Sequence, residues 1–376
     1  MKILVVFGTR PEAIKMVSVV KELQKCSLFD VKVCITAQHR EMLDSVMSIF
    51  DIKADYDLDI MKQNQDLYDV TAKILVKMRD VLDDFEPNLV LVHGDTTTTF
   101  SATLASFYKK IDVGHIEAGL RTGDLYAPYP EEANRKLTSV LAKYHFAPTL
   151  SAKNNLLKDG ICKNIVITGN TVIDTLFLML ETIEKDKLLN EKILHNLDSK
   201  GLKKDIYKKK FVLVTGHRRE NFGDGFLNIC NALKHIALNN TDINIIYPVH
   251  LNPNVQKPVN DILNGIKNIY LVSPLDYPEF VYLMDKSCII LTDSGGIQEE
   301  APSLGKPVLV MRDTTERPEA KESGTVKLVG TNKEKIIKEV EILLKDEKEY
   351  NKMSKANNPY GDGRASMKIV EFLKNI

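Results

Sequence analysis

Short apolar runs rich in β-branched residues alternate with longer amphipathic segments in the first half of the chain. Such runs are typical of strands buried on both faces, and the spacing between them is typical of helices. The predicted strands are Lys2–Phe7, Val31–Thr36, Asn88–His93, Ile111–Ile116, Tyr144–Ala147 and Ile165–Thr168. The predicted helices are Glu12–Lys25, Arg40–Phe50, Leu67–Phe85, Thr98–Lys109 and Glu131–Leu141.

A second series with the same alternation follows a lysine-rich stretch, residues 184–210, which predicts solvated helices and a loop. Its predicted strands are Phe211–Thr215, Ile243–Tyr247, Ile269–Val272, Cys288–Leu291, Pro307–Val310 and Thr325–Leu328. A last amphipathic helix is predicted at Ala365–Asn375.

The pattern therefore predicts an α/β protein with two Rossmann-like, doubly wound domains facing a cleft. We expect the domains to span residues 1–168 and 169–360, with residues 361–376 packing back on the first domain. Ligands of open parallel sheets bind outside the carboxyl ends of the strands, so functional residues are expected directly after the strands.

Composition narrows the class of protein. The 376 residues include 51 Lys+Arg and 51 Asp+Glu, and this balance disfavours a nucleic-acid-binding protein. No apolar run approaches the ~18 residues of a membrane helix, so no membrane insertion is expected. The five scattered cysteines fit a reducing compartment, and the eight histidines form no zinc motif. We expect a cytoplasmic protein without a metal or other cofactor.

The first strand ends in a turn that suits an anion. Gly8 permits a tight turn, Pro11 fits the first turn of a helix, and Arg10 and Lys15 add positive charge. The segment lacks the GxGxxG fingerprint, which disfavours a nicotinamide-dependent enzyme. A surface arginine at a βα turn remains the alternative for Arg10.

Three carboxylates follow strands of the first domain. Asp95 comes after the third strand, where it fits an N-cap equally well. Glu117 ends the fourth strand, and an acid there is unfavourable unless it is paired or used. Glu131 opens a helix, where the helix dipole also favours it. Together they indicate general acid–base chemistry.

The second domain carries the basic loop of a phosphate site. His217, Arg218 and Arg219 follow its first strand and favour a phosphorylated ligand, although a solvated basic turn is the alternative. His250 ends the next strand and fits a half-buried structural imidazole equally well.

The strongest local signal is the segment LTDSGGIQEEAP at residues 291–302. The backbone amides of Ser294, Gly295 and Gly296 can cradle a diphosphate at a helix start. Glu300, one turn later, can accept the hydroxyls of a ribose, and Arg317 follows the next strand. The segment indicates a nucleotide-sugar site.

These motifs in this order resemble the bacterial non-hydrolysing UDP-N-acetylglucosamine 2-epimerase family, and the resemblance runs from residue 1 to the NPYGDG segment at 358–363. It implies a glycosyltransferase-B-like fold, a homodimer and interconversion of UDP-GlcNAc and UDP-ManNAc. It places Lys15 by the phosphates and Asp95, Glu117 and Glu131 by the sugar. The residues that it implies for the UDP are Arg10, His217, Leu275, Phe280, Ser294, Gly295, Gly296, Glu300 and Arg317.

Some members of that family bind UDP-GlcNAc at a second, activating site. The residues that match this pattern are Gln38, His39, Gln65, Glu131, Arg218 and His250. Glu41 and Asn64 depart from the Gln and Arg that some relatives have.

The chemistry of C2 fits these residues. No carbonyl acidifies the C2 proton, so inversion needs either a transient oxidation or an elimination of UDP to a glycal and its re-addition. Elimination needs acid–base groups near C2 (Asp95, Glu117 and Glu131) and a site, including His217, that stabilises the departing diphosphate. The alternatives are a hydrolysing epimerase that releases ManNAc and UDP, a UDP-sugar glycosyltransferase, and a non-catalytic UDP-sugar sensor.

Overall fold

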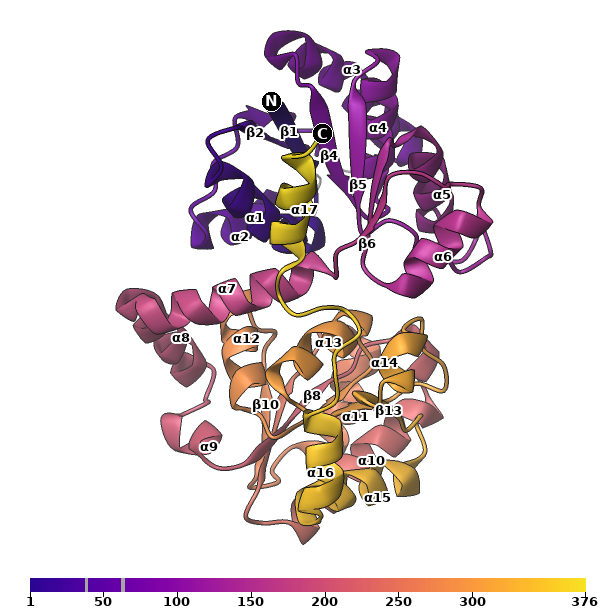
Figure 1. Cartoon of the computed structure of the whole chain (residues 1–376). Coiled ribbons are helices and arrows are strands. Elements are labelled where there is room, and N and C mark those ends of the chain that lie inside the picture. Colours follow the sequence, from indigo (N-terminus) through magenta and orange to yellow (C-terminus); the bar gives the residue numbers. More distant parts are fainter. Residues whose placement is uncertain (38–39, 62–64) are drawn as a thin grey trace. The chain divides into compact units, whose positions relative to one another are not determined.

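The structure is a computed structural model that describes residues 1–37, 40–61 and 65–376 (Figure 1). The chain divides into two compact units. The first consists of Met1–Thr175 and Tyr360–Ile376, and the second of Leu176–Pro359.

The first unit is built on a parallel sheet with the strand order β3-β2-β1-β4-β5-β6-β7. The strands are β1 (Lys2–Phe7), β2 (Asp30–Ile35), β3 (Tyr56–Asp57), β4 (Leu89–His93), β5 (Asp112–Ile116), β6 (Tyr144–Ala147) and β7 (Ile165–Ile167). The helices are α1 (Arg10–Gln24), α2 (Arg40–Ile49), α3 (Leu67–Phe85), α4 (Thr97–Tyr108), α5 (Glu131–Leu141), α6 (Leu150–Lys158) and α17 (Ala365–Leu373).

The second unit repeats the doubly wound plan with the strand order β10-β9-β8-β11-β12-β13, again parallel. Its strands are β8 (Phe211–Thr215), β9 (Asn244–Pro248), β10 (Ile269–Val272), β11 (Ile289–Thr292), β12 (Val308–Val310) and β13 (Val326–Leu328). The helices are α8 (Lys187–Ser199), α9 (Lys204–Lys208), η1 (Arg219–Asn221), α10 (Asp224–Asn239), α11 (Pro253–Leu263), α12 (Tyr277–Lys286), α13 (Gly295–Glu300), η2 (Ala301–Leu304), α14 (Pro318–Glu322), α15 (Lys333–Lys345) and α16 (Glu347–Ser354).

The two parallel sheets with their flanking helices confirm the predicted fold class. Every predicted strand is present, and its ends differ from the prediction by at most one residue. The central strands are buried on both faces, as β1 shows with five consecutive buried residues, which explains their continuous apolar runs. The pattern missed β3 because two residues, Tyr56 and Asp57, carry no periodicity.

The first unit continues past the expected boundary at residue 168 into the first turn of α7 (Thr171–Lys185). Polar contacts hold this turn to the unit. The Asp174 carboxylate accepts hydrogen bonds from the amides of Ala365 and Ser366 at 3.1 and 2.7 Å. The Thr175 hydroxyl bonds Ser18 Oγ at 3.1 Å. The boundary therefore follows buried hydrogen bonds that a hydrophobic pattern does not reveal.

The last segment of the chain packs on the first unit, where α17 lies against α1 (Figure 1). The backbones of Gly169 and Gly361 approach closely at its entry, and both have positive φ angles of 92° and 119°. A Cβ at Gly169 would lie 3.0 Å from the carbonyl oxygen of Tyr360, which also accepts the amide of Asn170 at 2.7 Å. This close approach explains why residue 361 is a glycine.

Candidate functional site

The strand orders place Arg10 and Asp95 on the two sides of one point where the winding direction reverses, and His217 and Ser294 on the two sides of another. In the first sheet this point lies between β1 and β4, and in the second between β8 and β11. Ligands of open α/β sheets bind at such points, beyond the carboxyl ends of the strands. Each unit therefore carries its own set of candidate residues at the carboxyl ends of its strands.

The turn after β1 is fixed by a buried carboxylate. Thr9 caps α1, and Glu12 completes a capping box with it. The buried Glu12 also accepts the hydroxyl of Thr96 at 2.8 Å, which ties this turn to the one after β4. Burial raises the pKa of Glu12, and the hydrogen bonds from Thr96 and Thr9 counteract it. Arg10 is thereby held in the first turn of α1.

Glu117 is the central carboxylate of the first unit. It is 9% exposed, and its φ of 62° is uncommon for a residue with a side chain. Lys15 forms an ion pair with its Oε2, and the Asn170 amide donates to the same oxygen at 2.8 Å. The expectation that an acid here must be paired is correct. The strained backbone and the two donors hold the carboxylate in one position.

His93, at the end of β4, lies beside Glu117. Its side chain is 4% exposed, and Nε2 lies 3.8 Å from Glu117 Oε2. Neither ring nitrogen has a hydrogen-bond partner among the described residues. Burial lowers the pKa of His93 to about 4, with Glu117 acting in the opposite direction. The ring is therefore neutral near pH 7.

Two further buried histidines occupy the neighbouring strands. His115 on β5 pairs in register with His145 on β6, and His115 Nε2 contacts the Gly94 carbonyl at 2.7 Å. Burial lowers the pKa of His115 to about 3 and that of His145 to about 4. Both rings are neutral at physiological pH.

Asp95 does not cap α4, because Thr96 is the N-cap residue and accepts the amide of Thr99 at 3.2 Å. The Asp95 carboxylate instead pairs with Arg135, and Asn134 donates to the Asp95 carbonyl at 2.9 Å. Its side chain is 23% exposed. Asp95 is thus held by α5 and keeps access to solvent.

Glu131 begins the same helix α5, which lacks a side-chain N-cap bond. Its Oε2 is buried and has no hydrogen-bond partner in the described part of the chain. The next residue, Glu132, is fully buried and accepts the amides of Thr122 and Gly123 at 3.2 and 3.3 Å. Adjacent acids therefore have different roles, Glu132 holding the preceding loop while Glu131 retains an unused oxygen.

The segments that carry the three carboxylates predicted from the sequence contact one another. A Cβ at Gly94 would lie 3.8 Å from Glu117 Oε1, so Glu117 lies against the residue that precedes Asp95. Asn134, in the first turn of α5 that Glu131 opens, binds the Asp95 backbone. This arrangement can supply proton donors and acceptors to one ligand.

In the second unit, Asp293 organises the loop after β8. Its Oδ2 accepts the amides of His217 and Arg218, both at 2.8 Å, and its Oδ1 lies 3.5 Å from His217 Nδ1. Asp293 is fully buried. The loop conformation of His217 is therefore set by a carboxylate on the neighbouring strand.

The His217 ring stacks on His250, with ring centroids 5.3 Å apart and an interplanar angle of 15°. Burial lowers the pKa of His217, Asp293 raises it, and His250 and Arg218 lower it further. His250 is exposed, and its Nδ1 accepts the amide of Asn252 at 3.1 Å. The stacked pair presents two imidazoles at the carboxyl ends of β8 and β9.

The glycines after β11 leave room for Arg317. A Cβ at Gly295 would lie 3.1 Å from Arg317 Cζ, so the guanidinium lies directly on this glycine. Arg317 Nε donates to the buried Glu299 at 2.8 Å. Glu300 lies close to Gly296, whose Cβ would be 3.6 Å from Glu300 Oε1. The backbone amide of Ser294 donates a hydrogen bond to Thr292 Oγ1 at 3.0 Å.

Arg317 belongs to a cluster of guanidinium groups around Glu316. Burial alone would raise the pKa of Glu316, but Arg317, Arg312 and Arg218 together lower it. Arg317 bonds Glu316 at 2.9 Å, and Arg312 is also paired with Glu220 at 2.5 Å. Glu220, Glu299 and Glu316 hold Arg312 and Arg317 in place, and guanidinium groups held in this way can bind a phosphate with paired hydrogen bonds.

The remaining residues predicted to bind a ligand are placed as follows. Leu275 and Phe280, in the loop after β10 and in α12, are half-buried. Gln65 Oε1 accepts from Lys73 at 3.5 Å. Gln38, His39 and Asn64 lie outside the described residues, and so does the side chain of Glu41.

Sequence reasoning named no role for four residues that hold the predicted ones in place. They are His93, Arg135, Asn170 and Asp293. His93 ends a predicted strand and Asp293 stands inside the 291–302 segment, so their positions were an available signal. Arg135 and Asn170 act across 40 and 53 residues of sequence, a separation that local patterns do not span.

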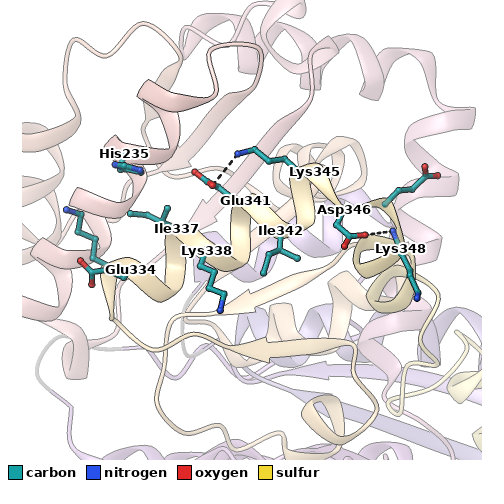
Figure 2. A pocket seen from close by; sticks show the side chains of 11 residues that line it. His235, Glu334, Ile337, Lys338, Glu341, Ile342, Lys345, Asp346 and Lys348 are labelled. Carbon is teal, nitrogen blue, oxygen red and sulfur yellow. Dashed lines mark hydrogen bonds and ion pairs between the residues drawn. The ribbon is translucent and has the colours of Figure 1, made fainter.

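A surface hollow of about 940 Å³ lies elsewhere on the second unit, between α10, α15 and α16 (Figure 2). Lysines and acids line it, among them the ion pair of Glu341 and Lys345 at 3.2 Å. None of the candidate residues lines this hollow.

No helix in the described part of the chain combines the length and the apolarity that crossing a bilayer requires.

Two Rossmann-like units with acids in the first and a basic, glycine-bearing phosphate loop in the second define a glycosyltransferase-B-like nucleotide-sugar protein. The family model of UDP-N-acetylglucosamine 2-epimerase matches residues 21–374. The UDP-N-acetylglucosamine 2-epimerase of Campylobacter jejuni is 62% identical over 373 residues, which cover 99% of this chain and 97% of that protein. This chain belongs to the UDP-N-acetylglucosamine 2-epimerase family, which confirms the resemblance.

Solved structures agree with this assignment. The crystal structure of UDP-GlcNAc 2-epimerase from Neisseria meningitidis bound to UDP-GlcNAc is similar with a TM-score of 0.88 and 55% identity, covering 100% of both chains. That of the Methanocaldococcus jannaschii enzyme in complex with UDP-GlcNAc and UDP has a TM-score of 0.78 at 36% identity, also covering 100% of both chains.

Proposed function

We propose that this chain reversibly inverts C2 of UDP-GlcNAc to give UDP-ManNAc. The observation that carries the proposal is the buried Glu117 carboxylate, which Lys15 and Asn170 hold directly after β5, at the carboxyl end of the first sheet. A relative that is 62% identical and is named UDP-N-acetylglucosamine 2-epimerase supports the same assignment.

The proposed reaction is an elimination followed by a re-addition. A base removes the C2 proton while the C1–O bond breaks, the bonding electrons leave with UDP, and a C1–C2 double bond forms in a 2-acetamidoglucal. UDP then adds back to C1 while a proton is delivered to the opposite face of C2. The net change is the configuration at C2, so no oxidant is needed.

Asp95, Glu117 and Glu131 share the proton transfers in this proposal. Two groups are needed near C2, because the proton leaves from one face and returns to the other. Their different surroundings suit a division of roles. Glu117 is held by donors, Asp95 is paired with Arg135, and Glu131 has a buried oxygen for which residues 1–37, 40–61 and 65–376 offer no hydrogen-bond partner.

The departing diphosphate is stabilised by positive charge and backbone amides in this proposal. Arg10, Lys15, His217 and Arg317 supply the positive charge that binds the diphosphate. The backbone of Ser294, Gly295 and Gly296 lets the diphosphate approach closely. Leu275 and Phe280 contact the uracil region, and Glu300 accepts the ribose hydroxyls.

Chromatography of nucleotide sugars tests the proposal. The purified chain should convert either UDP-GlcNAc or UDP-ManNAc into the same mixture of both. D95N, E117Q and E131Q should each lower the rate, on the order of 100-fold or more for a lost acid or base. D112N, which alters an acid at the opposite end of β5 paired with Lys143, is the control. An amide variant with full activity removes that residue from the mechanism.

A second, activating UDP-GlcNAc molecule is part of the proposal, with Gln65, Arg218 and His250 among its ligands. Activation predicts that UDP-ManNAc alone reacts slowly until UDP-GlcNAc accumulates, and immediate linear turnover contradicts it. We also propose a homodimer, measurable by light scattering, that supplies ManNAc units for surface polysaccharide.

A further inference from the structure

The buried imidazole of His93 has no role in the mechanism above. Its side chain is 4% exposed, and both ring nitrogens are without a hydrogen-bond partner among the described residues. Buried polar groups are nearly always hydrogen-bonded, and an exception calls for an explanation. A structural role alone would be met by an apolar side chain at this strand end.

The ring faces the reacting carboxylate. His93 Nε2 lies 3.8 Å from Glu117 Oε2, the oxygen to which Lys15 and Asn170 are bound. Glu117, directly after β5, and Lys15 from α1 are the ionisable groups whose charges act on His93. The distance of 3.8 Å between Nε2 and Oε2 is longer than the ~2.7–3.2 Å of a hydrogen bond. A movement of less than about 1 Å would bring the two atoms into hydrogen-bond distance.

A neutral imidazole suits a carboxyl group that changes protonation. Its Nε2 donates to an ionised carboxylate in one tautomer and accepts from a carboxylic acid in the other. The Lys15 ammonium and the Asn170 NH2 group, which bind the same oxygen, can only donate. They therefore cannot accept the O–H of a protonated Glu117, whereas the Nε2 of His93 can.

We propose that His93 is a positioning residue for the reaction, and that its Nε2 closes onto Glu117 Oε2 to hold that carboxyl group in both protonation states. The inference rests on the proposed function, in which Glu117 exchanges a proton with C2. The ring keeps one proton throughout, on Nε2 while Glu117 is ionised and on Nδ1 while Glu117 is protonated, so the net proton balance of the elimination is unchanged.

Three substitutions of His93 distinguish the contribution of its Nε2 from that of its Nδ1. The amide of Gln reaches about as far as Nε2, the amide of Asn about as far as Nδ1, and Phe keeps a ring without either. We expect H93Q to keep most of the wild-type kcat. H93N and H93F should lose about 10- to 100-fold in kcat with little change in KM, since a misplacement of about 1 Å has an effect of this size.

H145F is the matched control, because His145 is a buried histidine on β6 that contacts no carboxylate in the part of the chain that the structure describes. It should keep the wild-type kcat. Thermal unfolding and UDP affinity, measured for every variant, identify any loss that comes from misfolding.

Two results overturn the inference: H93F with wild-type kcat, or H93Q, H93N and H93F that lose kcat equally and in proportion to their Tm. Failure of the proposed function gives a different result, since the wild-type protein itself would then leave UDP-GlcNAc unchanged.

Discussion

The carboxylate of Asp293 reaches His217 in two ways, with Oδ2 accepting the His217 amide at 2.8 Å and Oδ1 lying 3.5 Å from the ring Nδ1. The first contact fixes the backbone of the loop after β8, and the second favours a proton on Nδ1. The Nε2 lone pair is then left for the ligand. One buried acid thus fixes the backbone of the loop and, from 3.5 Å, favours one tautomer of the proposed catalytic histidine.

Asp293→Asn should separate these two contacts. The Asn oxygen can still accept the backbone amides, but its NH2 group would face Nδ1 and reverse the tautomer. We expect kcat to fall on the order of 100-fold while the protein stays folded. Steady-state kinetics with circular dichroism measures this. Unchanged kcat would show that the ring orientation has no effect.

UDP binding should be accompanied by proton uptake near neutral pH. Burial lowers the pKa of the free His217, so the ring is largely neutral at pH 7. A diphosphate beside it raises this pKa, and the ring takes up part of a proton. Calorimetry in buffers with different ionisation enthalpies measures the uptake. H217Q should reduce it, and equal uptake in both proteins would assign it to another group.

Gly295 should be intolerant of a side chain. Alanine there would place Cβ 3.1 Å from the Arg317 guanidinium and displace it. Hydrogen bonds to charged groups contribute ~1.5–3 kcal/mol, so the affinity for UDP should fall about tenfold or more. G225A in α10, where Cβ would meet only the side chain of Thr331, is the control glycine variant. Wild-type affinity in G295A would place the diphosphate away from Arg317.

The sequence predicted the two sheets and the strand-end residues, because buried parallel strands leave a continuous apolar pattern and the chemistry follows them. It did not predict the contacts that hold those residues. The sequence fits Asp95 as the N-cap of α4, but Thr96 occupies that position in the structure. Asp95 pairs with Arg135 instead. The pairing of Asn170 with Glu117 depends on the fold of the whole first unit. The relative roles of the three acids stay predictions.

The buried histidines should make the first unit sensitive to acid. His145 has a folded pKa of about 4 against an ordinary value of 6.5, so the unfolded chain binds its proton first as pH falls. Stability from this group is present above pH 6.5 and is lost as pH falls toward 4, a change of roughly 3 kcal/mol.

The variant H145F should therefore show a weaker decrease in unfolding free energy between pH 6.5 and 4 than the wild type. Glu12 and Asp174, whose pKa values are raised by burial, act in the opposite direction and are unchanged in the variant. Urea unfolding at several pH values measures the difference. Parallel pH profiles would contradict a neutral, buried His145.

The most direct test of the central claim is proton NMR of the purified protein with UDP-GlcNAc in heavy water, without added NAD or metal. Reversible epimerisation through C2–H cleavage predicts a rising UDP-ManNAc anomeric signal, deuterium at C2 and a constant final mixture. Free ManNAc and UDP accumulating to completion would show the hydrolysing reaction instead. An unchanged spectrum with UDP-GlcNAc bound would contradict the proposal and favour a glycosyltransferase or a UDP-sugar sensor.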